Sequence, residues 1–198
     1  MKRLILVTAL SICSAVAAAA TQSTSSTKIS TTTVDTSNTV NGIRVELLVP
    51  MLEFKLSAMG RSFRESIDST YGLGIGYAYL PIQDLGFTTR LSYLNAQEND
   101  DSVGIARLEG NLGTSLNQVV NLKGGLNMSK IVATSGGDIS DYEMGFGFQA
   151  SLGLQINKNF GLDLGYTQMN QTLGKSSTRS IDVDIELSGP EISLNGTF

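Results

Sequence analysis

Charged side chains recur at every second position in several segments of this chain, and chemistry would have to come from them. The candidates are Arg90, Arg107, Glu109, Lys123, Glu143, Asp163, Asp182, Asp184 and Glu186. In the run Asp182-x-Asp184-x-Glu186, the three carboxylates would lie in a row on one face of a strand. Such a row can contribute to a metal site, form a catalytic pair, or accept ion pairs from cationic side chains. We favour ion pairs, because a hard cation needs six or more oxygen ligands.

Other catalytic groups are scarce. The chain has no His, and its one cysteine, Cys13, lies in an N-terminal segment that we expect to be removed. The remaining chain would have no thiol nucleophile, no Ser-His-Asp triad and no imidazole for zinc or haem. We therefore expect no enzymatic activity, no cofactor and no metal. The net charge of −4, which loss of Lys2 and Arg3 takes to about −6, argues against nucleic-acid binding.

The first 20 residues have the features of an export signal. Two cations precede an apolar stretch over 4–16, and small residues follow up to Ala20, after which we expect cleavage. The stretch is too short for a transmembrane helix, which needs about 20 apolar residues. Ile12 stands where a lipidation signal at Cys13 would need a small residue. In 21–41, 13 of 21 residues are Ser or Thr without periodicity, which predicts a disordered periplasmic leader.

Residues 42–198 alternate apolar and polar residues with a period of two, which predicts β-strands. We expect eight strands, at about 43–57, 71–79, 85–93, 106–113, 120–128, 142–156, 160–167 and 181–198. Tight turns near 81–84, 117–119 and 157–159 alternate with longer connections near 57–70, 95–102, 133–141 and 170–180. This alternation predicts an all-β fold, an eight-stranded antiparallel up-and-down barrel.

Three observations favour lipid on the apolar face over a soluble barrel with its apolar face inside. The strands are long, since the pattern at 142–156 far exceeds the 5 to 6 residues of an average soluble strand. The polar face is rich in glycine, which suits a crowded interior. Aromatic residues gather near strand ends as interfacial girdles would; they are Tyr71, Tyr93 and Tyr142 at one end and Tyr79, Phe87, Phe160 and Phe198 at the other.

The interior of an eight-stranded barrel is just wide enough for side chains to fill. Besides the candidates above, the alternation places Arg44, Glu46, Glu53 and Lys55 on the inner face. Buried charges must find partners of opposite sign. We therefore predict a filled polar interior, in which Arg90, Arg107 and Lys123 pair with carboxylates of other strands.

The first and last strands each lose the phase of their alternation once. The first is apolar at odd positions from Ile43 and at even positions from Leu52, with Pro50 between them. The last strand changes phase at Gly189-Pro190. Proline is confined to edges and bulges of sheets. We predict a matched irregularity where these strands close the barrel, with Pro50 beside Pro190.

The export signal, eight alternating strands and terminal Phe198 resemble the small OmpA/OmpX-type outer-membrane barrels over residues 42–198. The resemblance implies that Ile192, Leu194, Gly196 and Phe198 form the assembly signal read by the barrel-insertion machinery. It implies a bacterial outer-membrane location. It fixes no molecular activity.

From these features we expect a structural or interaction role, in envelope integrity, surface contact or adhesion through short extracellular loops. The alternatives are a narrow passive pore for small solutes or ions and a soluble periplasmic ligand-binding barrel. The expected partners are outer-membrane lipid and lipopolysaccharide, the insertion machinery and periplasmic chaperones, and we expect a monomer.

Overall fold

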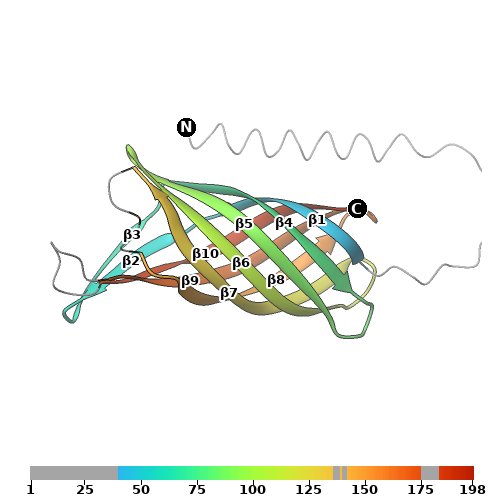
Figure 1. Cartoon of the computed structure of the whole chain (residues 1–198). Coiled ribbons are helices and arrows are strands. Elements are labelled where there is room, and N and C mark those ends of the chain that lie inside the picture. Colours follow the sequence, from blue (N-terminus) through green and yellow to red (C-terminus); the bar gives the residue numbers. More distant parts are fainter. Residues whose placement is uncertain (1–39, 136–138, 140–141, 175–182) are drawn as a thin grey trace, which may run out of the picture. The chain divides into compact units, whose positions relative to one another are not determined.

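The computed structural model describes residues 40–135, 139, 142–174 and 183–198, whose long regular elements are β-strands (Figure 1). They are β1 (Val40–Pro50), β2 (Glu53–Ala58), β3 (Arg61–Ser66), β4 (Ser69–Leu80), β5 (Gly86–Glu98), β6 (Asp101–Ser115), β7 (Val120–Thr134), β8 (Gly145–Gln155), β9 (Phe160–Leu173) and β10 (Val183–Thr197). No helix in these residues is long and apolar enough to cross a membrane. The predicted export signal and leader lie outside the described residues, except that Val40 and Asn41 belong to β1.

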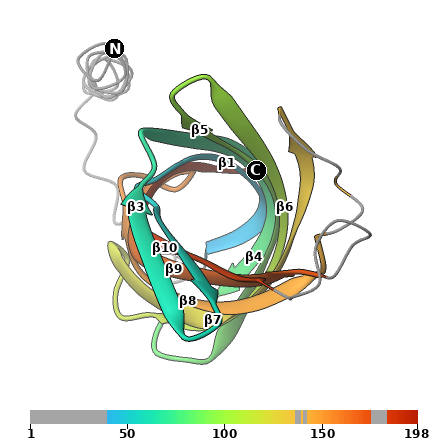
Figure 2. The same ribbon diagram turned by 90° about the vertical axis from the view of Figure 1, so that its left-hand side faces the viewer.

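Antiparallel pairing closes these strands into a ring, with β1 joined to β10 (Figure 2). β1 and β2 both pair with β10 and form one long strand, interrupted at Met51–Leu52. β3 pairs with β2, and β4 pairs with β1, so β3 and β4 together form the next long strand. The ten segments thus make an eight-stranded antiparallel barrel, which confirms the predicted fold class.

Two tight turns at one end of the barrel are each stabilised by an asparagine side chain that accepts two backbone hydrogen bonds. Asn117 accepts hydrogen bonds from the backbone N–H groups of Val119 and Val120, both at 2.8 Å. Asn157 accepts them from Asn159 and Phe160, at 2.9 and 3.0 Å. Asn is favoured in turns because its side-chain oxygen can accept hydrogen bonds in place of a backbone carbonyl. These two turns lie where the sequence predicts them.

Two of the predicted long connections are largely strand. β5 runs to Glu98 and β6 begins at Asp101, which leaves a two-residue turn in which Asn99 has φ +52°. The first connection is mostly the β2–β3 hairpin, whose tip residues Met59 and Gly60 have φ of 51° and 74°. Positive φ at both central residues fits hairpin twist. Polar segments without alternation were predicted as loops, but backbone pairing extends through them.

The seam between β1–β2 and β10 keeps one register throughout. Pro50 lies opposite Glu191, and beyond the interruption Glu53 lies opposite Ser188, which is the same alignment. The backbone N–H of Met51 donates to the carbonyl of Pro190 at 2.8 Å. The strand is interrupted at this point, but the predicted change of phase is wrong. Among the described strand pairs, a register shift lies instead between β6 and β7, at Gly104 and Ile105.

Candidate functional site

The outer face of the barrel is apolar. Leu126 is 72% exposed and Phe146 67%, although both belong to regular strands. Other exposed apolar side chains on neighbouring strands are Leu73, Ile75, Leu91, Tyr93, Leu108, Leu112, Phe148, Leu164 and Tyr166. A soluble protein does not leave so large a continuous apolar surface in water. A closed barrel with this exterior can span a bilayer, because the strands hydrogen-bond to one another around the ring and leave no open edge to the lipid.

Eight charged side chains form a connected network inside this ring. Four are cationic and four are carboxylates, so the network is neutral as a whole. They are Arg44, Glu46, Arg90, Arg107, Glu109, Lys123, Asp163 and Glu191. They come from β1, β5, β6, β7, β9 and β10. The network therefore ties six strands together through their side chains.

Arg90 and Arg107 are the hubs of the network. Arg90 contacts three carboxylates on three other strands, with Nη1 at 2.5 Å from Glu46 and Nη2 at 2.6 Å from Glu109 and 2.7 Å from Glu191. The side chain of Arg107 is fully buried, with Nε at 2.6 Å from Glu109 and Nη2 at 2.7 Å from Glu191. Its Nη1 donates to the hydroxyl of Thr167 at 3.1 Å. The planar guanidinium suits such multiple pairing.

Asp163 links the rest of the network. Its Oδ2 lies 2.8 Å from Nη2 of Arg44 and 2.5 Å from Nζ of Lys123. Nε of Arg44 in turn lies 3.3 Å from Glu46, which pairs with Arg90. Every charge thus has a partner of opposite sign, which offsets the cost of removing it from water.

Glycines on the neighbouring strands make room for these side chains. A Cβ added at Gly74 of β4 would come within 3.0 Å of Cδ of Arg90. A Cβ at Gly153 of β8 would come within 2.5 Å of Oδ1 of Asp163. The glycine on the polar face therefore leaves volume for the long charged side chains opposite. About 30 Å³ remains free beside the network, which is enough for only about two waters.

Several predicted lumen residues lie elsewhere. Glu186 pairs with Lys55 on the outer face at 3.2 Å, and both side chains are about one-third exposed. Asp184 is exposed and accepts a hydrogen bond from Thr172 at 3.4 Å, and Glu53 and Glu143 are also exposed. Asp182 lies outside the described residues. Within the described part of the chain, no cluster of three or more potential ligand residues could hold a metal ion.

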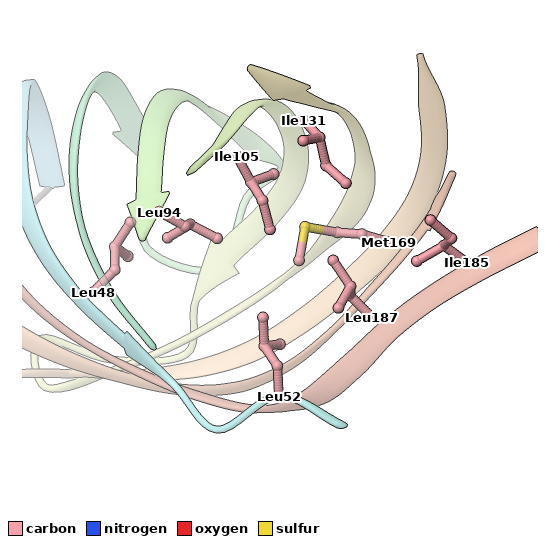
Figure 3. Close-up of a cluster of buried hydrophobic side chains, with 8 residues drawn as sticks. All are labelled: Leu48, Leu52, Leu94, Ile105, Ile131, Met169, Ile185 and Leu187. Carbon is pink, nitrogen blue, oxygen red and sulfur yellow. The ribbon is translucent and has the colours of Figure 1, made fainter. Parts of the chain in front are cut away.

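These charged residues were wrongly assigned to the interior because part of the interior is apolar. Eight side chains, each at most 4% exposed, point toward one another in the barrel interior (Figure 3). This apolar layer consists of Leu48, Leu52, Leu94, Ile105, Ile131, Met169, Ile185 and Leu187. Two of them, Leu94 and Ile105, lie opposite each other near the β5–β6 turn. On β6 the inward side chain that follows Ile105 is Arg107, so the apolar layer rests on the charged one. Tyr142, predicted in a girdle, packs against this layer.

Glu191 was missed by the prediction. Its odd position downstream of Pro190 already had the inward parity in the prediction, but it was not included. The assumed change of phase at Pro190 instead put the even positions upstream on the inner face, which misplaced Asp184 and Glu186. In the structure the odd positions point inward throughout, from Ile185 and Leu187 to Glu191 and Ser193. Counting back from the strand's last residues with a single parity would have found Glu191 and avoided this misplacement.

Of the predicted assembly signal, Ile192, Leu194 and Gly196 have the outward parity of β10, and Phe198 follows directly after the strand. Ile192 and Leu194 are half-buried, and Phe198 is 72% exposed. Phe198 closes the seam through its backbone, because it accepts a hydrogen bond from Ile43 at 3.0 Å and donates one back at 2.9 Å. Gly196 lies under its ring, since a Cβ there would be 3.1 Å from Cε2 of Phe198.

Comparison with known proteins gives matches to solved barrels. No protein-family model matches the chain, and no curated protein matches it. Neisserial surface protein A is 17% identical over 79% of this chain and 97% of its own, with a TM-score of 0.46. The attachment invasion locus protein Ail of Yersinia pestis is 14% identical over 78% and 98%, with a TM-score of 0.44. Outer membrane protein OprG of Pseudomonas aeruginosa is 10% identical over 78% and 94%, with a TM-score of 0.43.

The chain has the fold of a small outer-membrane barrel. That statement rests on its own closed ring, apolar exterior and charged interior, and it agrees with the predicted resemblance to the OmpA/OmpX type. At these identities the likeness to the solved proteins concerns the fold alone.

Proposed function

We propose that this chain is a non-conducting barrel of the bacterial outer membrane with a structural or surface-interaction role. The observation that carries the proposal is the ion-pair network, which fills the lumen and leaves about 30 Å³ beside it. A passive pore needs a continuous path of water, and a cavity of this size holds about two water molecules.

The network also supports a structural role because it links strands that are far apart in the sequence. Arg90 on β5 and Arg107 on β6 both contact Glu191 on β10, across the interior of the barrel. Such contacts hold the ring in one shape in addition to its backbone hydrogen bonds. A rigid barrel is a suitable support for loops that meet partners at the cell surface.

The β2–β3 hairpin is the element best placed for such contacts. It extends beyond the ring at the end opposite the tight turns (Figure 1). Its outer face carries Lys55 and Arg64, which pair with Glu186 and Glu53 at 3.2 and 3.7 Å. This mixed charge suits polar surroundings outside the lipid, such as the head groups of lipopolysaccharide.

Conductance in planar lipid bilayers tests the proposal. We expect the purified full chain to insert without opening steps. A matched variant, Arg90→Ala with Glu46→Ala, keeps the interior neutral but removes two long side chains, and we expect it to conduct. Reproducible opening steps from the unaltered chain would overturn the proposal in favour of a narrow pore. Silence of the variant under conditions where it is inserted would show that the network is not what closes the lumen.

A further inference from the structure

A pocket opens within the apolar layer, on the side of the β5–β6 turn. Its volume is about 230 Å³, larger than an engineered apolar cavity of about 150 Å³ that binds benzene. Its walls are the apolar side chains Phe54, Ala96, Ile105, Ile131, Ile185 and Leu187. They come from β2, β5, β6, β7 and β10, so the pocket is enclosed by the ring rather than laid over one face of it.

The rim of the pocket has one sign of charge. Glu65, Glu98 and Asp101 line it, and its described lining contains no Lys or Arg. Glu98 and Asp101 face each other across the β5–β6 turn. Glu65 is exposed on β3, which leads into β4, the strand that pairs with β5. The neighbouring cation Arg64 contacts Glu53 at 3.7 Å, away from this rim.

We propose that this pocket binds a small amphiphile that has an apolar tail and a positively charged head group. The tail would lie against the isoleucines of the wall, and the other members of the apolar layer, such as Leu94 and Met169, would stop it above the ion-pair network. The head group would lie among the three carboxylates, which attract a cation and repel an anion. Apolar walls with a few convergent polar groups are the usual form of a small-molecule site. The proposal rests on the fold and is independent of the structural role proposed above.

Methyl NMR of the full chain in lipid nanodiscs, with labelled isoleucine side chains, tests the proposal. The probe is octyltrimethylammonium below its micelle concentration, compared with octyl glucoside and octyl sulfate. We expect saturable shifts of the methyl signals of Ile105, Ile131 and Ile185. Ile43 and Ile75, which are 55% and 57% exposed on the outer face, report partition of the probe into lipid. We expect the sulfate to bind at least about tenfold more weakly than the ammonium compound, and less so at high salt.

Two variants separate the tail from the head group. Ala96→Leu fills the pocket and should abolish the shifts for all three probes, whereas Ala106→Leu, on the outer side of β6, should leave them unchanged. Glu65→Gln with Asp101→Asn should weaken binding of the ammonium compound about tenfold and leave the glucoside unaffected. This second pair alters only exposed residues, so it remains informative if Ala96→Leu does not fold.

Three results would overturn the proposal. One is a set of shifts that do not saturate and are matched at Ile43 and Ile75, which would indicate partition into lipid only. Another is equal affinity for the sulfate and the ammonium compound. The third is unchanged binding in a folded Ala96→Leu variant.

Discussion

Replacing Arg107 by alanine should weaken the barrel more than any change to its outer charges. The Arg107 side chain is fully buried and contacts Glu109 and Glu191 at 2.6 and 2.7 Å. Removing one partner of a buried ion pair costs about 3 to 5 kcal/mol, because the other charge stays buried. Here Arg90 still contacts both carboxylates, so we expect the lower end of that range, about 3 kcal/mol.

Equilibrium unfolding in guanidinium, followed by circular dichroism with the barrel in lipid vesicles, measures this loss. With a slope of roughly 3 kcal/mol per molar, 3 kcal/mol lowers the midpoint by about 1 M. The matched control is Lys55→Ala, which removes an outer-face pair of 3.2 Å that is about one-third exposed. Exposed pairs contribute about 0 to 1 kcal/mol, so its midpoint should barely move.

Two outcomes would refute this reasoning. If Arg107→Ala unfolds at the same midpoint as the unaltered chain, the network does not stabilise the fold. If Lys55→Ala lowers the midpoint as much, burial is not what makes the inner pairs strong. The variant Arg107→Lys keeps the charge and loses the fork of donors, so its midpoint should lie between the other two.

Four other perturbations test separate parts of the structure. Leu94→Ala in the apolar layer should cost about 2 to 5 kcal/mol in the same unfolding assay; a change below about 1 kcal/mol would mean that this layer is loosely packed. Gly74→Leu should impair folding, because a Cβ there already lies 3.0 Å from Arg90, and Gly74→Leu combined with Arg90→Ala should recover part of the loss. Phe198→Ala should reduce the membrane-assembled fraction in cells, measured by heat-dependent gel mobility, while Phe63→Ala on the hairpin should not. An epitope inserted after Gly60 should be accessible to antibody on intact cells, and detection only after permeabilisation would reverse the orientation proposed for the barrel.

The alternation of residue types predicts most of the strands and the tight turns, because a period of two is a local property. It also places Arg90, Arg107, Glu109, Lys123 and Asp163 on one face, and the structure brings these five together in the interior. Which carboxylate meets which cation depends on register and barrel closure, and neither is visible in the sequence.

The assignment of residues to the inner face failed on the part of β10 where polar side chains face outward and apolar ones face inward. Ile185 and Leu187 are apolar and inward, and Glu186 between them is outward. Alternation divides a strand into two faces but does not say which face is inside. A strand that leaves the lipid presents a polar outer face to water, so its apolar face turns inward without any change in the backbone.

The unbroken register through Met51–Leu52 therefore has a consequence for how the molecule sits in its surroundings. In one unchanged register the outer face passes from Ile43, Val45 and Leu47 on β1 to Glu53 and Lys55 on β2. The stretch from Ile43 to Met51 has the length of about 9 to 11 residues that a tilted strand needs to cross the hydrocarbon core. We infer that the reversal of polarity on this strand marks the edge of the bilayer. Beyond it the barrel is organised as a water-soluble protein, with a hydrophobic core and a charged surface, standing on a membrane-embedded base.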